Sequence, residues 1–144
     1  MSSRRKLREL ALQLLFQEDL THSNPEEILD VYLKEHPGSS ESYEFAEVLF
    51  RKSLEHRAQI DDLIRRHVRN WRLERLAVVD RNILRMAVSE FLYTETPKVV
   101  VIDEAIEIAR RYSTEDSSEF VNGILDAIRE ELESQSVEKA EHGK

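Results

Sequence analysis

The sequence predicts an all-helical protein that forms one compact domain. Apolar residues recur at helical spacing along most of the 144 residues, which is the main signal of amphipathic helices. The three glycines and three prolines supply little of the turn chemistry that a many-stranded sheet needs. Apolar residues make up 40% of the chain, enough for a compact core, and the 35% that are charged suit helices whose outer faces meet water.

The first two helices are marked by their apolar spacing and their end signals. The stripe of the first helix consists of Leu7, Leu10, Ala11, Leu14 and Leu15. The second begins at Asn24-Pro25-Glu26-Glu27, a pattern typical of an N-cap, a proline at the first helical position and an acidic first turn. We expect it to end near Glu35, because His36-Pro37-Gly38 follows.

The next helical pattern covers the segment from Ser42 to Asn70. It is either one long helix or two helices with a bend near Arg57. The serines within residues 39–42 offer N-caps for its start. The segment from Trp71 to Arg75 is expected to form a corner.

The segment from Leu76 to Tyr93 is the most apolar predicted helix and should therefore lie in the middle of the fold. Val99 to Ile102 has the propensity of a short strand. We predict a helix after Pro97 instead, because the helical period continues through Ile102, Ala105, Ile106 and Ala109.

The last predicted helix begins near Ser117 or Ser118. Its core face consists of Val121, Ile124, Leu125, Ile128 and Leu132. Beyond Ser134 the chain is polar and acidic, and we expect it to be disordered. The prediction is thus a domain over residues 1–134 and a tail over residues 135–144.

The composition argues against several classes of protein. Cysteine is absent, which removes disulfides, thiol catalysis and zinc–thiolate sites. No run approaches the ~20 apolar residues of a membrane span, and none follows the basic start as in a signal peptide, so a cytoplasmic protein without a membrane partner is expected. The net charge of −8 argues against indiscriminate binding to phosphate backbones. Since four of residues 4–8 are basic and residues 130–141 are largely acidic, any anion binding should be local.

The chain also lacks the motifs of common enzymes. There is no Gly-rich phosphate loop or dinucleotide-binding fingerprint, and the five histidines are scattered. Asp103, Glu104 and Glu107 place carboxylates one turn apart, as a metal site in a helical bundle could require. The Glu-x-x-His motifs of such sites are missing, so a solvated helix face is the favoured interpretation. We expect no enzymatic activity and no cofactor or metal.

Phe16 is the most informative residue of the first helix. At about 100° per residue it points away from the leucine stripe, in line with Arg5 and beside Arg8. Such a face suits single-stranded RNA, because arginines bind phosphates and an aromatic ring stacks on a base, worth ~1–3 kcal/mol per base. Alternatively, Phe16 packs under the second helix and the arginines are simply solvated.

Two further positions stand out near the helix starts. Phe120 lies at the edge of the last apolar stripe with Asp116 on the same side, either as core-edge packing or as a contact surface. Asp80 lies among apolar residues of the central helix, where an unpaired carboxylate is costly. Asp80 should therefore pair, for example with Arg85, or cap its own helix, or face a partner.

Four segments, in this order and spacing, resemble the NusB family between Arg4 and about Leu132. They are Arg4 to Phe16, Val79 to Ala87, Pro97 to Ala109 with Ile102-Asp103-Glu104-Ala105-Ile106-Glu107, and Phe120-Val121-Asn122-Gly123-Ile124-Leu125-Asp126.

The resemblance implies a fold of about seven helices in two small bundles. It also implies a partnership with NusE, a ribosomal protein of the small subunit. In that family the pair binds the boxA element of nascent RNA and, with other antitermination factors, helps RNA polymerase read through terminators, notably in ribosomal RNA operons. Carried over by motif, the candidates for RNA contact are Arg4, Arg5, Lys6, Arg8, Phe16, Asp116 and Phe120. Asp80 becomes the candidate for contact with NusE.

Two other hypotheses remain open at this stage. Similar domains occur fused to ribosomal RNA cytosine methyltransferases, so the chain could be the helical adaptor of an RNA-modification system without catalysis of its own. It could also be a structural adaptor with no role in RNA binding, in which case the basic start would be incidental.

Overall fold

The computed structural model describes residues 4–36, 43–68 and 72–142, and these residues form an all-helical fold, as predicted. The elements are α1 (Arg4–Thr21), α2 (Pro25–Glu35), α3 (Glu44–Glu55), α4 (Arg57–Arg65), the short 3-10 helix η2 (Leu73–Arg75), α5 (Val78–Tyr93), α6 (Lys98–Tyr112) and α7 (Glu115–His142). No helix in these ranges combines the length and the apolar character that crossing a membrane requires.

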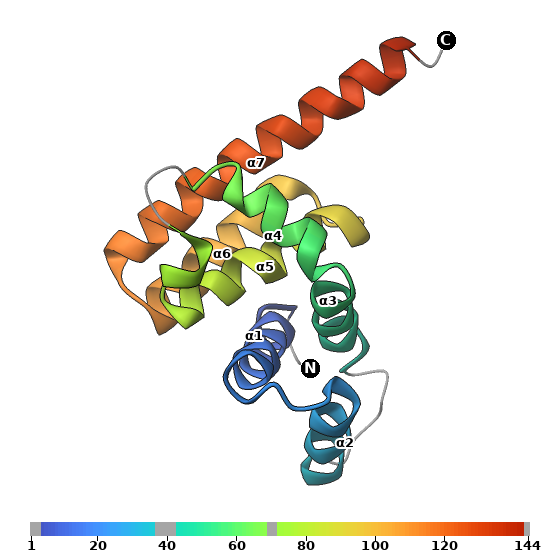
Figure 1. The fold of residues 1–144 in the computed structure, drawn as a ribbon, viewed down its shortest axis with the longest axis vertical. Coiled ribbons are helices and arrows are strands. Elements are labelled where there is room, and N and C mark those ends of the chain that lie inside the picture. The colour runs from blue at the N-terminus through green and yellow to red at the C-terminus, as the bar shows by residue number, and fades with distance from the viewer. Residues whose placement is uncertain (1–3, 37–42, 69–71, 143–144) are drawn as a thin grey trace.

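The helices form two groups around α5. Figure 1 shows α1, α2 and α3 together on one side and α4 to α7 on the other. The central helix α5 packs against α1, α3, α4, α6 and α7. Every residue from Asn82 to Phe91 is buried, including charged ones, which confirms the prediction that the most apolar helix occupies the middle of the fold.

The local signals in the first half of the chain act as expected. The Asn24 side chain accepts a hydrogen bond of 2.8 Å from the backbone N–H of Glu26 and so caps α2. Of the two alternatives for the following segment, the structure has two helices, because the chain bends at His56 between α3 and α4. The serine caps at residues 39–42 and the first residue of the expected corner lie outside the described residues.

The second half departs from the sequence prediction at the ends of α7. The prediction of a helix rather than a strand after Pro97 is confirmed by α6. Helix α7 begins at Glu115, earlier than predicted, because Thr114 Oγ1 accepts a hydrogen bond of 3.0 Å from the backbone N–H of Ser117. Its helical backbone continues to His142, through the segment that we expected to be disordered. The domain boundary near residue 134 stays a prediction.

Candidate nucleic-acid interface

The basic residues at the start of α1 have different surroundings, because consecutive residues on a helix diverge by about 100°. The guanidinium group of Arg4 lies over the ring of Phe45 on α3, 4.1 Å from the ring centre. The side chain of Arg5 points to α6, where it donates two hydrogen bonds to the Glu104 carboxylate at 2.7 and 3.2 Å. Lys6 is exposed and lines a groove beside α1.

Arg8 requires a correction, because it is not on the outer face of α1. Its side chain is 5% exposed and forms a two-pronged ion pair, at 2.8 and 2.6 Å, with Glu90 of α5, which is 1% exposed. Pairing makes the burial of both charges tolerable, since a lone charge there would be very costly. A helical wheel gives directions but not neighbours, so it could not reveal that α5 supplies a carboxylate on this side of α1.

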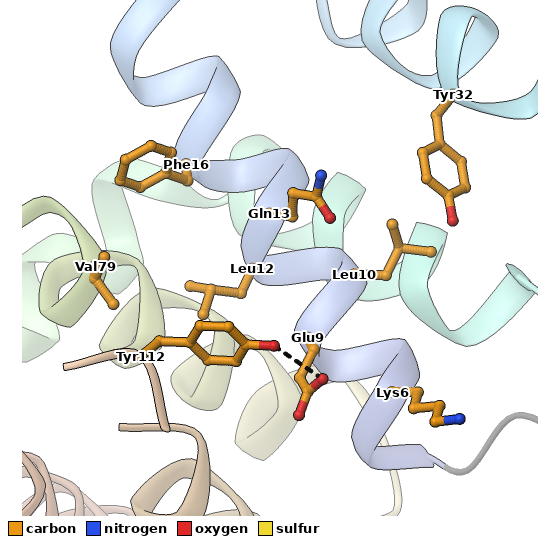
Figure 2. Close-up of a pocket in the computed structure, with 9 residues that line it drawn as sticks. All are labelled: Lys6, Glu9, Leu10, Leu12, Gln13, Phe16, Tyr32, Val79 and Tyr112. Carbon is orange, nitrogen blue, oxygen red and sulfur yellow. Dashed lines mark hydrogen bonds between the residues drawn. The ribbon is translucent and has the colours of Figure 1, made fainter. Parts of the chain in front are cut away.

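A groove of about 480 Å³ runs beside α1 and contains the side chain of Phe16. It is lined by Lys6, Glu9, Leu10, Leu12, Gln13, Phe16, Tyr32, Val79 and Tyr112. These residues come from α1, α2, α5 and α6, and Figure 2 shows the Phe16 ring at one end of the groove, at a distance from Tyr32 of α2. Phe16 is therefore half-buried at the wall of a groove, not enclosed under α2.

Tyr112 also lines the groove, although no role there was predicted from the sequence. Its hydroxyl donates to Glu9 Oε2 at 3.1 Å, and the neighbouring Arg111 donates to Glu9 Oε1 at 2.6 Å. Burial and the Glu9 carboxylate raise the pKa of the Tyr112 phenol, so it stays protonated as a donor at neutral pH. The sequence signal that points to Tyr112 is its position one turn beyond Ala109, the last residue of the apolar stripe that follows Pro97.

A second, smaller hollow of about 260 Å³ lies at the start of α5. It is lined by Arg75, Leu76, Ala77, Asp80, Asp116, Ser117 and Phe120. The fold thus brings Asp80 together with Asp116 and Phe120 of α7, which are far from it in the sequence. The two hollows flank the first turn of α5, since Val79 lines one and Asp80 the other.

Asp80 is buried, and its two carboxylate oxygens differ. Ser117 of α7 donates to Oδ2 at 2.8 Å, whereas the buried Oδ1 has no hydrogen-bond partner among the described residues. Pairing with Arg85, one of the alternatives for Asp80, does not occur, because that guanidinium group donates to Asp61 at 2.8 and 2.9 Å. Buried acceptors are nearly always hydrogen-bonded, so Oδ1 can accept a hydrogen bond from a water or from a partner molecule.

Two of the three carboxylates considered for a metal site form ion pairs with arginines. Arg5 donates hydrogen bonds to Glu104 and holds the pKa of that carboxyl below its usual value. Glu107 pairs with Arg110 on the same helix at 2.7 Å. Within the described ranges, no three His, Asp or Glu side chains are grouped so as to hold a metal ion.

The sequence comparisons agree with one another over nearly the whole chain. The sequence model of the NusB family matches residues 5–130. The chain is 44% identical over 140 residues to the transcription antitermination protein NusB of Koribacter versatilis, with 96% of each chain covered. It is 46% identical over 134 residues to the protein of that name from Geobacter sulfurreducens. That match covers 92% of this chain and 97% of the relative.

The solved structures give the same result for the fold. NusB of T. maritima superposes with a TM-score of 0.82 at 45% identity, covering 90% of this chain and 92% of that chain. A chain from the crystal structure of antitermination factors NusB and NusE in complex with dsRNA superposes with a TM-score of 0.77 at 31% identity. The match covers 87% of this chain and 94% of that chain. A family match over this length, together with relatives of this identity, shows that the chain belongs to the NusB family.

Proposed function

We propose that this protein is a transcription antitermination factor that binds a boxA-type single-stranded RNA together with the ribosomal protein NusE and supports transcription of ribosomal RNA operons. Its relatives carry the name of transcription antitermination proteins, and one solved relative forms a complex with NusE and RNA. Other antitermination factors and RNA polymerase would be reached indirectly. The proposed function requires a cytoplasmic protein, because bacterial transcription takes place there.

The groove beside α1 is the observation that carries this proposal. Phe16 stands half-buried at its wall, Lys6 is exposed along it, and Arg5 lies on the same helix with a side chain that is 41% exposed. A ring for stacking and cations for phosphates are the two elements that single-stranded nucleic acid requires. We leave Arg8 out of this surface, because its charge is buried and paired with Glu90.

The residues of the second hollow are proposed to contact two different partners, the RNA and NusE. Asp116 and Phe120, which line this hollow, remain proposed RNA contacts. Asp80, which lines it too, remains the proposed NusE contact. The unsatisfied Oδ1 of Asp80 suits a hydrogen-bond donor from a partner protein. We further infer that the protein acts by binding and presentation, without bond chemistry of its own.

The test is a titration of fluorescent boxA-type RNA with the protein, with and without its cognate NusE, at one salt concentration. A scrambled RNA and a boxA duplex serve as competitors, the duplex because the solved complex contains dsRNA. We expect selective binding of the single strand that NusE strengthens. Equal binding of all three RNAs, even with NusE, would favour the helical-adaptor alternative.

Phe16→Ala separates a stacking residue from a packing residue. We expect RNA affinity to fall by about 5-fold to 150-fold, as the loss of one stacked base implies, with an unchanged melting temperature. Leu20→Ala removes an exposed apolar side chain one turn further along α1 and is the matched control. A large fall in the melting temperature of Phe16→Ala, without a specific loss of RNA binding, would assign Phe16 to the core.

A further inference from the structure

Tyr112 presents an aromatic ring to the groove in a fixed position. The residue is 49% exposed, so its ring is accessible to a ligand in the groove. Its hydroxyl is tied to Glu9 of α1, so the ring spans from α6 towards α1, as Figure 2 shows. The hydrogen bond lowers the entropy that the ring would lose on binding a ligand.

The ring of Tyr112 lies at the same end of the groove as the ring of Phe16. Figure 2 shows Leu12 and Val79 between the two rings, where they form an apolar floor. The groove volume of about 480 Å³ is within the range of cavities that accept small aromatic ligands. Two rings with an apolar floor match the flat, weakly polar faces of a nucleobase.

The charges around this end of the groove favour a nucleotide over an apolar peptide. The carboxylate of Glu9 would repel a phosphate, but Arg111 and the Tyr112 hydroxyl donate to its two oxygens. Lys6 and Arg5 lie along α1 towards its N-terminus. They supply positive charge for the phosphates of an RNA whose base is bound in the groove. An apolar peptide would gain nothing from these cations.

We propose that Tyr112 is a second stacking residue and that one unpaired base of the bound RNA sits between its ring and the ring of Phe16. The inference rests on the proposed function and deepens it, since it assigns a base-binding position within the same surface. Glu9 acts as a positioning residue that holds the Tyr112 ring in place.

The first experiment measures the affinity of boxA-type RNA, with NusE present, for Tyr112→Leu and Tyr112→Phe. We expect the leucine variant to lose about 5-fold or more and the phenylalanine variant to recover most of that loss, because stacking needs the ring and not the hydroxyl. Tyr93→Leu is the matched control, since Tyr93 stacks on His56 on another part of the surface. Melting temperatures and NusE affinity are measured for all variants.

The second experiment locates the base. Abasic nucleotides are placed at one RNA position at a time, and each RNA is titrated against wild type, Tyr112→Leu and Phe16→Ala. At one RNA position, we expect the loss of affinity from removing the base and the loss from removing either ring to be non-additive. Two groups that contact each other show such energetic coupling. Both rings should couple to that same position.

The outcomes separate the inference from the proposed function. If wild type does not select boxA-type RNA, both fail. If wild type binds selectively but the losses for Tyr112→Leu add at every position, the proposed function stands and the base position between the two rings is wrong. A loss of NusE affinity alone would make Tyr112 a protein contact and would also overturn the inference.

Discussion

The arginines at the start of α1 show how a residue's partner decides its role. Arg8 meets a buried carboxylate on α5 and becomes part of the interior. Arg5 meets Glu104 at the surface, where its side chain stays 41% exposed and can still reach an incoming phosphate. If Arg5 contacts RNA as proposed, Glu104 competes with the RNA for its guanidinium group, because the face that binds a carboxylate also binds a phosphate.

Glu104→Gln should consequently bind RNA more tightly than wild type. Surface ion pairs of this kind are weak, so we expect a gain of about two-fold to five-fold in affinity and nearly unchanged stability. The fall of RNA affinity with salt concentration should also become steeper, by the amount that about one additional phosphate contact implies. The reason is that the charge of Arg5 would no longer be compensated by Glu104. Fluorescence anisotropy at several salt concentrations measures both effects.

The control is Glu107→Gln, which removes the same charge one turn further along α6. Glu107 pairs with Arg110 and does not hydrogen-bond to Arg5. An equal gain in both variants would mean that general electrostatics, rather than release of Arg5, is responsible.

Among the elements, α7 differs most from its prediction. Its core residues Val121, Leu125 and Ile128 are buried, but the described side chains from Glu133 to Val137 are exposed, and Figure 1 shows the C-terminal part of the helix projecting beyond its neighbours. Pairs within the helix support this polar part: Arg129 binds Asp126 and Glu133, and Gln135 binds Glu131. A helix that is polar all round can persist on such pairs.

Removal of residues 137–144 should therefore change stability very little. We expect a change in the free energy of unfolding within about 0.5 kcal/mol, as for surface substitutions that break no packing. Ile128→Ala on the same helix is the contrasting control and should cost ~2–5 kcal/mol. Urea unfolding followed by circular dichroism measures both. A loss above about 2 kcal/mol on truncation would show that the projecting segment packs against the domain.

At the scale of the whole molecule, a network of charges joins the two groups of helices. Asp19 of α1 accepts hydrogen bonds from Arg81, Asn82 and Arg85 of α5, at 2.9 to 3.3 Å. Arg85 in turn binds Asp61 of α4. The network holds the end of α1 against α5, close to the groove that contains Phe16, which lies one turn before Asp19.

The network predicts acid sensitivity. Burial alone would raise the pKa of Asp19, but the hydrogen bonds from Arg81 and Asn82 outweigh it and hold the pKa below its usual value. Such a group stabilises the fold above its unfolded pKa of ~3.9, and the contribution is lost as the pH falls through the lower folded pKa. The free energy of unfolding should thus decline below about pH 4. Glu104 and Glu131, whose pKa values are also lowered, contribute in the same direction.

Asp19→Asn measures how much Asp19 contributes to the stability of the fold and to its loss at low pH. The variant should be less stable at neutral pH by about 2 kcal/mol, because charge-assisted hydrogen bonds are lost. Its decline below pH 4 should be shallower than that of wild type, since one titrating group is gone. Urea unfolding between pH 7 and pH 2.5 measures both slopes. Parallel slopes would contradict the role of Asp19.

The sequence by itself determined the helices and the kind of surface to look for. The helical period, the Asn24 cap and the apolar run from Leu76 to Tyr93 act over a few residues, so they can be recognised without knowledge of the fold. The same holds for Phe16, whose direction away from the leucine stripe follows from helix geometry alone.

The tertiary structure alone decided which side chains meet. The pairing of Arg8 with Glu90, the donation of Ser117 to Asp80 and the placement of Tyr112 and Phe16 in one groove all bring together residues that are distant in the chain. Helical periodicity states which way a side chain points but not which helix lies there. The packing around α5 supplies that information, because α1, α6 and α7 each pack against this one helix.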